Sequence, residues 1–425
     1  MRQQRPTHPE VALMFRLLRP LCVLMALGAA DSAPAEPRTL TAEEAVRLAL
    51  ERNPDVRTAE EDLVAAKARL AGASLLLQSN PGVTASAGPR SSPAGRTRDH
   101  SVQILQQIEI GGQRGARMEA AKAAVESSQA RVQAARAEVA GRVRESFGRA
   151  LGAEQRVRLA TETLGLAQQG VAVAEERFAA GAAALIEVNT ARVELGRASR
   201  DKGEAERRRA EAAAELHLLA ALDPGDMTLQ GDLASPESLE TADAGGRVEE
   251  ALANRGEILA SRRALDAAKA ELRLAAREWI PSPRIGASYT REEESSTSIV
   301  QGVVSIDVPV FNRNKAARGV AAARVSQLEA ASAATERRVR QEVITATARL
   351  QAARGAADGY AGGVVKAMQE NMDLAAESYR AGKIDFLQLL VIRRQTLDAR
   401  REYIDVLEEL SAARAQLDRA LGRVH

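Results

Sequence analysis

The sequence is poor in cysteine, in aromatic residues and in long apolar runs. Its 425 residues include one cysteine, and phenylalanine, tyrosine and tryptophan together make up 2%. Beyond the N-terminal region, no segment approaches the roughly twenty consecutive apolar residues that a transmembrane helix requires. If this chain crosses a membrane, it must therefore do so as a closed β-barrel, because only that alternative satisfies every backbone polar group in lipid.

The residues that are abundant favour long helices. Hydrophobic residues make up 45% of the chain, charged residues 27%, and the formal net charge is +2. A mixture rich in Ala, Glu, Arg and Leu is typical of coiled coils and long helices, and it is too hydrophobic for a disordered chain. The balance of acids and bases argues against nucleic-acid binding, which requires a strongly basic face.

The N-terminus has the pattern of a secretory signal. Arginines precede a short apolar run at 21–30, and Ala33-Pro34-Ala35 offers a cleavage site, with Gly28-Ala29-Ala30 as a second candidate. We predict a signal peptide over 1–35, with an uncleaved anchor as the alternative. Cys22 lies inside the apolar run, and Arg19-Pro20-Leu21 before it does not fit a lipidation site. The mature chain is then expected to carry no thiol and no lipid.

The chain repeats itself at an interval of about 200 residues. Two similar halves, 36–222 and 247–425, are joined by a linker at 223–246 that is rich in Pro, Gly, Asp and Ser. The matching segments are Ala65–Leu70 with Ala267–Leu272, Pro81–Val83 with Pro283–Ile285, Ile108–Gly112 with Val308–Asn312, and Phe178–Gly181 with Tyr379–Gly382. Chance similarity between Ala-rich helices is the alternative, but the strand and turn positions match as well. Each half therefore predicts the same order of elements.

Each half contains a pair of strands between its shorter and longer helices. The predicted strands are 83–90 and 101–110 in the first half, and 284–291 and 299–310 in the second. Apolar residues such as Val102 and Ile104 alternate with polar ones such as Gln103. One apolar and one polar face suit a barrel through an outer membrane, with 88–100 and 291–298 as external loops. A soluble hairpin packed on a core would give the same alternation.

Long stretches without proline predict very long helices. None occurs from Gln113 to Phe178 or from Lys315 to Tyr379, so each stretch would form a rod of roughly 100 Å. Leu390, Leu397 and Ile404 recur at intervals of seven, which indicates a seam between helices. The internal glycines of these stretches could mark bends or close contacts, or could reflect composition alone.

These features together resemble the TolC family of outer-membrane efflux proteins. The resemblance rests on the segment from Thr41 to Pro54, on the duplicated order of elements, and on the turns at Phe178–Gly181 and Tyr379–Gly382. It implies a mainly α fold with a small β part. In this fold a long α-helical barrel continues from a transmembrane β-barrel, to which each protomer of a homotrimer contributes four strands. The motifs Ile108–Arg114 and Val308–Asn314 are similar to the CzcC-like heavy-metal branch.

The resemblance also implies partners and sites. The chain would be an outer-membrane channel subunit whose helices extend into the periplasm, where a membrane-fusion adaptor and an inner-membrane pump, of the RND type, complete a tripartite efflux pump. The implied adaptor contacts at the periplasmic tip are Phe178, Gly181, Leu185, Tyr379, Gly382 and Leu387. Glu187 corresponds to an acidic position near the constriction. Its counterpart in the second half is Gln388, a departure from the family pattern, and Asp385 is a substitute candidate.

The residues predict no catalytic, cofactor or metal site. His8, His100, His217 and His425 share no ligand spacing, and the loop at 111–115 lacks the ending of a phosphate loop. We therefore expect no enzyme. The alternative function is a periplasmic coiled-coil scaffold or an efflux adaptor, although adaptors usually carry one helical hairpin and not a duplicated one.

Overall fold

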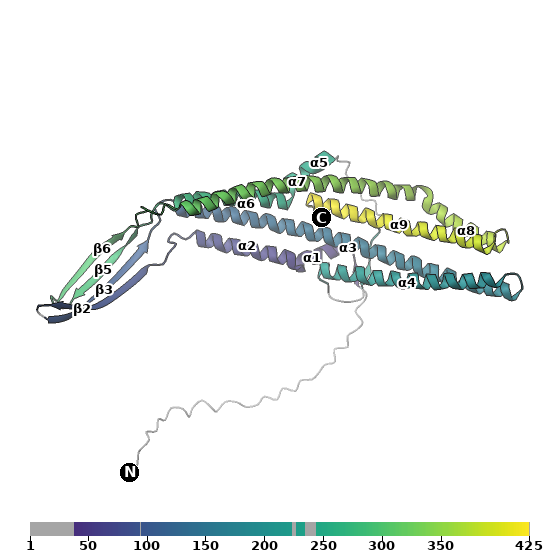
Figure 1. The fold of residues 1–425 in the computed structure, drawn as a ribbon, viewed down its shortest axis with the longest axis horizontal. Helices are drawn as coiled ribbons and strands as arrows, with labels where there is room; N and C mark the ends of the chain where they lie inside the picture. The colour runs from purple at the N-terminus through teal and green to yellow at the C-terminus, as the bar shows by residue number, and fades with distance from the viewer. Residues whose placement is uncertain (1–37, 94, 223–226, 234–243, 425) are drawn as a thin grey trace, which may run out of the picture. The chain divides into compact units, whose positions relative to one another are not determined.

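A computed structural model describes residues 38–93, 95–222, 227–233 and 244–424 (Figure 1). The part from Thr39 to the C-terminus forms one compact unit by itself. The predicted signal peptide at 1–35, with Cys22, lies outside the described residues, as do 223–226 and 234–243 of the predicted linker. The remainder of that linker holds a short strand, β4 (Met227–Leu229), and Gln230 next to it donates a backbone hydrogen bond to Leu40 of β1 (Arg38–Leu40).

The two halves have the same order of elements, as the repeat predicts. The first half holds α1 (Ala42–Arg52), α2 (Pro54–Ala73), β2 (Gly82–Ser92), β3 (Gly95–Gln107), α3 (Gln113–Ala179) and α4 (Leu185–Ala220). The second half holds α5 (Ala244–Asn254), α6 (Gly256–Arg277), β5 (Arg284–Glu292), β6 (Thr297–Ser305), α7 (Lys315–Gly359), η1 (Tyr360–Val364), α8 (Val365–Arg380) and α9 (Phe386–Leu421). Each half therefore supplies one strand hairpin and one long helical hairpin.

The first helices begin at the residues that the sequence indicates. Thr41 is the N-cap of α1, and its side chain accepts a hydrogen bond from the backbone N–H of Glu44 at 3.2 Å. Asn53 caps α2 by accepting from the N–H of Asp55 at 2.9 Å, with Pro54 as the first helical residue. The buried Asn53 amide also donates to the Leu219 carbonyl at 3.0 Å, which ties the start of α2 to the end of α4.

The two strand hairpins join into one antiparallel sheet in the order β2-β3-β5-β6. The predicted loop 291–298 was nearly right, since β5 ends at Glu292 and β6 begins at Thr297. The predicted loop 88–100 was largely wrong, because pairing between β2 and β3 continues to Ser92 and Gly95. Arg90 of β2 supports this extension through ion pairs of 2.7 Å with Asp99 of the adjacent strand β3 and with Glu292 of β5, the strand beyond it. Charged residues at these positions thus bridge strands and do not mark a loop.

Two strands end earlier than the alternation predicts. β3 stops at Gln107 and not at 110, and β6 stops at Ser305 and not at 310. Pro309 has no N–H to donate to a ladder, so regular pairing is not sustained up to 310. The apolar alternation continues through Val308 and Val310 although the pairing does not, and both side chains are exposed.

The prediction of an uninterrupted second long helix was wrong. α3 runs continuously for 67 residues, but the corresponding helix breaks into α7, a five-residue π-helical segment η1, and α8. Gly363 within η1 has φ of 146°, a value that residues with a Cβ rarely adopt. The glycine pair Gly362-Gly363 therefore marks a break in the helix.

Other internal glycines mark close contacts between helices. A Cβ added to Gly152 of α3 would lie 2.5 Å from the carboxylate of Glu408 in α9, and one added to Gly256 of α6 would lie 2.5 Å from the backbone nitrogen of Ala134 in α3. Gly256 requires a residue without a side chain, because the atoms facing it belong to the α3 backbone, whereas the flexible end of the Glu408 side chain can shift away from a Cβ at Gly152. By contrast, Gly165 and Gly355 have no atom within 4 Å of an added Cβ, so their helices do not need glycine there.

The main core lies where helices of both halves pack together. Its fully buried side chains include Val143 of α3, Val343 of α7, Leu216 of α4 and Ile258 of α6, and Leu417 of α9 joins them. A second, smaller cluster lies near the turns of the two helical hairpins. Most of the strand residues belong to neither cluster, and the sheet of β2, β3, β5 and β6 lies beyond one end of the helices (Figure 1).

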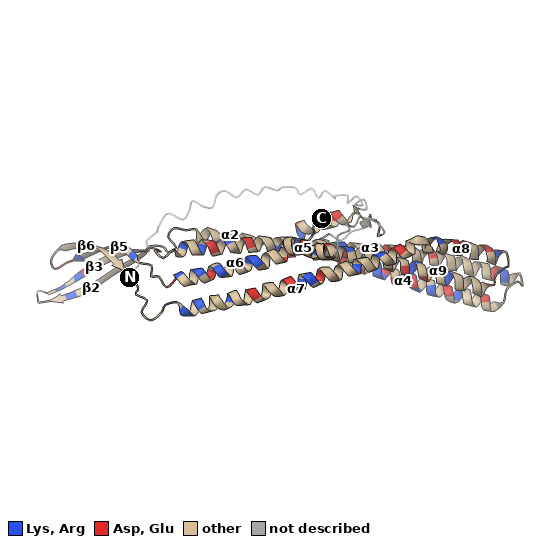
Figure 2. Ribbon diagram, turned by 90° about the horizontal axis from the view of Figure 1, so that it is seen from above, with Lys and Arg blue, Asp and Glu red and all other residues tan. Residues whose placement is uncertain are grey.

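The helices carry acidic and basic residues in alternation along their length (Figure 2). Among the described residues, no helix is both long enough and apolar enough to cross a membrane.

Candidate functional site

Both helical hairpins reverse direction at a glycine. Gly181 has φ of 71° and Gly382 has φ of 69°, and each follows a helix as the residue after its C-cap. In both turns the glycine N–H donates to a carbonyl of the last helical turn, and so does the N–H of the next residue. The Ala182 N–H donates to the Arg177 carbonyl and the Lys383 N–H to the Ser378 carbonyl, each at 2.8 Å. This is the Schellman arrangement, which needs a left-handed residue. The two predicted turns therefore share one geometry.

The residues around these turns differ in exposure. Phe178, Leu185 and Leu387 are exposed large apolar side chains, at 45%, 55% and 62%. Tyr379, the counterpart of Phe178, is only 9% exposed and is not available as a surface contact. Five of the six predicted tip residues, all except Tyr379, thus lie on the surface of the turns.

One exposed apolar residue was missed from the sequence. Ile186 is 72% exposed, the most of any large apolar side chain near the turns. The two turn glycines are 201 residues apart, and this offset relates Ile186 to Leu387 and relates Leu185 to Phe386, which is buried. Applying the repeat offset residue by residue would have found Ile186.

The three constriction candidates have different settings. Asp385 and Gln388 form the capping box of α9: the Gln388 N–H donates to Asp385 Oδ1 at 2.7 Å, and the Asp385 N–H donates to Gln388 Oε1 at 3.1 Å. Glu187 lies in the first turn of α4, half-buried, and its Oε2 has no hydrogen-bond partner among the described residues. Two of the candidates therefore cap a helix, and Glu187 differs in carrying a buried carboxylate oxygen without a hydrogen-bond partner among the described residues.

A small cluster packs the two hairpins together just inside the turns. Its buried members are Ala174, Val188, Ala191, Ala375, Tyr379, Phe386 and Leu389. The Tyr379 ring lies 6.0 Å from that of Phe386, and the Arg177 guanidinium lies over it at 4.9 Å from the ring centroid. The buried Tyr379 hydroxyl has no hydrogen-bond partner among the described residues.

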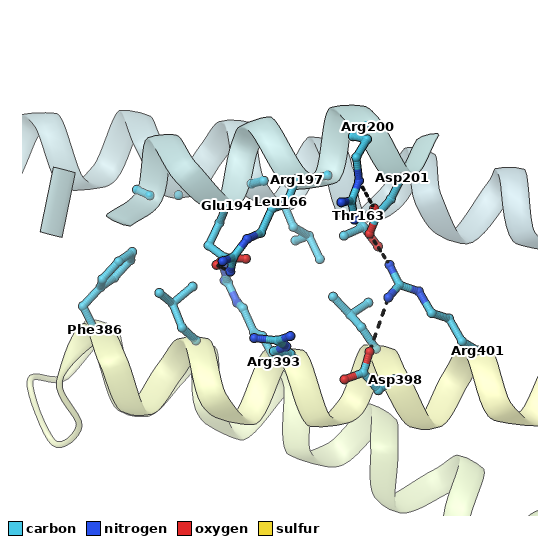
Figure 3. A pocket seen from close by; sticks show the side chains of 17 residues that line it. Thr163, Leu166, Glu194, Arg197, Arg200, Asp201, Phe386, Arg393, Asp398 and Arg401 are labelled. Atoms are coloured by element: carbon cyan, nitrogen blue, oxygen red, sulfur yellow. Dashed lines mark hydrogen bonds and ion pairs between the residues drawn. The ribbon is translucent and has the colours of Figure 1, made fainter. Parts of the chain in front are cut away.

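A cavity of about 360 Å³ lies between the hairpins, lined by α3, α4 and α9 (Figure 3). Ion pairs cross it: Arg401 of α9 contacts Asp201 of α4 at 3.0 Å and Asp398 of its own helix at 3.3 Å, and Arg200 contacts Asp201 at 2.7 Å. Arg393 also lines this cavity, and no ion pair links it to any described residue. Burial lowers the pKa of Arg393, and the nearby Arg380 lowers it further.

The sheet carries an exposed apolar face. Ala85, Val102, Tyr289 and Val300 pair in one row across the four strands, and Thr84, Gln103, Ser288 and Gln301 form the next row on the opposite face. Large apolar side chains with exposures from 43% to 75% are Val83, Val102, Ile104, Ile285, Tyr289, Val300 and Val304. A contiguous exposed apolar surface of this kind marks contact with a partner or with lipid.

The described residues give no arrangement for metal chemistry, since they hold no cluster of three or more His, Cys, Asp or Glu side chains. His217 is engaged with the Ala213 carbonyl of its own helix at 2.7 Å, as expected of a helix-surface residue. His8 and His425 lie outside the described residues.

The fold is that of the outer-membrane channels. The Campylobacter jejuni CmeC outer membrane channel matches with a TM-score of 0.76 at 17% identity, over 90% of this chain and 85% of CmeC. The open state of the Neisseria gonorrhoeae MtrE outer membrane channel matches with a TM-score of 0.71 at 23% identity, over 90% and 89% of the two chains.

The family model for outer membrane efflux proteins matches residues 45–222 and 248–423. The chain therefore belongs to the outer membrane efflux protein family, and its location is the outer membrane. This membership confirms the predicted fold class and the prediction that the chain is not an enzyme.

A curated relative is the cobalt-zinc-cadmium resistance protein CzcC of Cupriavidus metallidurans, which is 27% identical over 194 residues. The alignment covers 46% of this chain and 46% of CzcC, so the chain matches about half the length of that relative. The similarity agrees with the resemblance to the heavy-metal branch that the sequence motifs indicate.

Proposed function

We propose that this chain is the outer-membrane channel subunit of a tripartite efflux pump and gives exported solutes a passive path from the periplasm to the exterior. It acts with a periplasmic membrane-fusion adaptor and an inner-membrane pump of the RND type. The observation that carries the proposal is the four-stranded sheet with one exposed apolar face and one polar face. Family membership disfavours the alternative of a coiled-coil scaffold or adaptor.

The sheet explains why a homotrimer is proposed. Within the described residues, β2 and β6 have no strand on their outer edges, and four strands are too few to close a barrel, for which eight is about the minimum. Sheets from three copies would close on one another with the apolar face towards lipid and the polar face towards a wet lumen. The helices of each half would then continue the duct into the periplasm.

The hairpin turns are the proposed adaptor contacts. Phe178, Gly181, Leu185, Gly382 and Leu387 are all exposed at the turns, and Ile186 extends the same apolar surface. Exposed apolar side chains at the end of a helical hairpin favour docking by another helical hairpin. Tyr379 would support these contacts from within the buried cluster just inside the turns. Glu187 remains the proposed acidic residue near the constriction, whereas Asp385 and Gln388 act as a helix cap.

Heavy-metal cations are the proposed cargo. The similarity to CzcC and the motifs Ile108–Arg114 and Val308–Asn314 support this substrate class. Deleting the gene in its own host and measuring growth on cobalt, zinc and cadmium salts tests it. Increased sensitivity to these salts, restored by a plasmid copy, is expected, and unchanged sensitivity would contradict the substrate class without affecting the channel itself.

The channel proposal is tested by fractionating membranes and comparing unheated with heated detergent extracts on gels. We expect a detergent-dependent trimer in the outer membrane. Val300→Arg, on the apolar face, is expected to abolish this species, because each lipid-facing arginine near the midplane costs about 2–4 kcal/mol. Gln301→Arg, one residue along and on the polar face, serves as the matched control and should still assemble. A protein that extracts in buffer alone would refute the proposal.

A further inference from the structure

The two helical hairpins differ at one pair of equivalent positions. In the first hairpin, Arg192 of α4 forms an ion pair with Glu175 of α3, with Nη2 and Oε1 2.7 Å apart. The offset of 201 residues between the turn glycines relates Arg192 to Arg393 and Glu175 to Ala376. The second hairpin has therefore kept the arginine and lacks the acid that would pair with it.

Arg393 has no substitute partner within the described part of the chain. No described side chain or carbonyl accepts a hydrogen bond from it, and its Nε is buried without a partner. In Figure 3, dashed lines connect Arg401 to acidic residues, whereas Arg393 has none. Its match Arg192 is exposed and paired, but Arg393 is half-buried. A partly buried cation without a counter-charge is costly, so an anion from elsewhere would be favoured there.

A cavity of about 550 Å³ opens at the place of the missing acid. Both Ala376 and Arg393 line it, so the space beside the arginine is empty of any carboxylate side chain from α8. Its other ionisable walls are Arg177, Arg380 and Lys383 and one acid, Asp385. Oδ1 of Asp385 is already engaged in capping α9. The cavity is therefore strongly positive.

The same cavity contains a second unsatisfied donor. Tyr379 lines it with a side chain that is 9% exposed, and its hydroxyl has no hydrogen-bond partner among the described residues. Arg393 and Tyr379 thus both present unused polar groups in one enclosure formed by α3, α8 and α9 of a single chain. An arginine fork next to a hydroxyl is well suited to a planar carboxylate or to a phosphate.

We propose that this cavity binds a small anion bearing a carboxylate or phosphate group, with the Arg393 guanidinium and the Tyr379 hydroxyl as its donors. The anion takes the place that the Glu175 carboxylate occupies beside Arg192 in the first hairpin. Arg380 and Lys383 add long-range attraction. Because the walls come from one chain, a free solute fits the site better than a side chain of another copy.

Isothermal titration calorimetry of the full-length protein in detergent tests the site, with citrate and inorganic phosphate as probes at constant ionic strength in a chloride background. We expect at least one of the two to bind the unaltered protein. Arg393→Gln should weaken that binding about tenfold to a hundredfold, the range expected for loss of a charged hydrogen bond. Tyr379→Phe should weaken it several-fold.

Two further variants separate the site from general charge effects. Ala376→Glu supplies the missing carboxylate from within the chain, so it should abolish anion binding and raise the thermal unfolding midpoint in chloride. Arg192→Gln removes the matched paired arginine and should leave binding unchanged.

The proposal is wrong if the unaltered protein binds neither probe, or if binding persists in Arg393→Gln or in Ala376→Glu. Equal loss of binding in Arg192→Gln would also overturn it, since it would indicate a non-specific charge effect. None of these outcomes bears on the channel function, which the membrane fractionation tests separately.

Discussion

The two helical hairpins come from a duplicated sequence but are built differently. α3 continues without interruption for 67 residues, while the corresponding helix breaks at Gly362 and Gly363, between α7 and α8. The return helices differ as well, since Asp385 caps α9 with its side chain and the equivalent Ala184 of α4 cannot. In the second hairpin the outgoing helix is therefore interrupted, and the return helix begins with a side-chain cap.

The main core is much less affected by this divergence. Leu216 and Leu417 occupy equivalent positions near the ends of the return helices, and both are buried in the same cluster. The comparison indicates that the halves remained alike where they pack on each other and diverged towards the hairpin turns. Substitutions at matched positions test whether the two regions differ in this way.

The largest effect is expected in the main core. Leu216→Ala and Leu417→Ala should each lower the free energy of unfolding by about 2–5 kcal/mol, because each removes a buried side chain and leaves a cavity. Chemical denaturation in detergent would measure both. Similar losses would support equivalent roles in the two halves. A loss below 1 kcal/mol at only one position would contradict the symmetry of the core.

The helix break should give the next largest effect. Gly363→Val forces a β-branched side chain into a backbone with φ of 146°, and we expect a loss of about 1–3 kcal/mol. Gly355→Ala, eight residues earlier in regular helix with open space around it, is the control and should stabilise by up to about 1 kcal/mol. Thermal unfolding followed by circular dichroism would test both. A neutral Gly363→Val would show that the break does not depend on glycine.

The caps of the return helices offer a reciprocal test of smaller size. Asp385→Ala removes the capping box of α9 and should cost about 1 kcal/mol. Ala184→Asp places a capping side chain at the extended N-cap of α4 and should stabilise by a similar amount. Hydrogen exchange of the first-turn amides would detect both changes locally. If Ala184→Asp leaves the exchange of α4 unchanged, the difference between the hairpins does not lie in the cap.

The smallest effect concerns Glu154 of α3. Burial raises the pKa of Glu154, although Arg158 and Arg209 oppose the shift. The folded state therefore binds the proton more tightly than the unfolded state does, so ionised Glu154 destabilises the fold above its folded pKa. Glu154→Gln should slightly raise the unfolding midpoint at pH 7, and this gain should vanish as the pH falls below about 4, the ordinary pKa of a glutamate. Unfolding measured at both pH values tests this, and a gain that is equal at both would contradict it.

Much of the fold could be predicted because its signals are local. Proline-free stretches, alternating strands and the glycines at 181 and 382 each constrain the backbone near themselves, so the elements and turns were found at nearly the right residues. The duplicated sequence then indicated two similar halves, and the family resemblance led to the fold class that the family model confirms.

The sequence was less informative where a residue's setting depends on what lies across from it. Asp385, a constriction candidate, also accepts a hydrogen bond from the Gln388 N–H and caps a helix. Tyr379 and Phe178 are equivalent in sequence, yet one is buried and the other exposed. No periodicity in the sequence distinguishes these cases, because exposure is set by the neighbouring hairpin.

The helices, the strands, their duplication and the two faces of the sheet could thus be predicted from the sequence, since backbone preferences and burial patterns depend on residues close together in the chain. The tertiary structure was needed to show which glycine breaks a helix, as Gly363 does, and which lets two helices pack closely, as Gly256 does. It also showed that Arg192 pairs with Glu175, whereas Arg393 has no ion-pair partner among the residues that the structure describes. The physical reason is that charge pairing and close packing depend on distances between segments far apart in the chain.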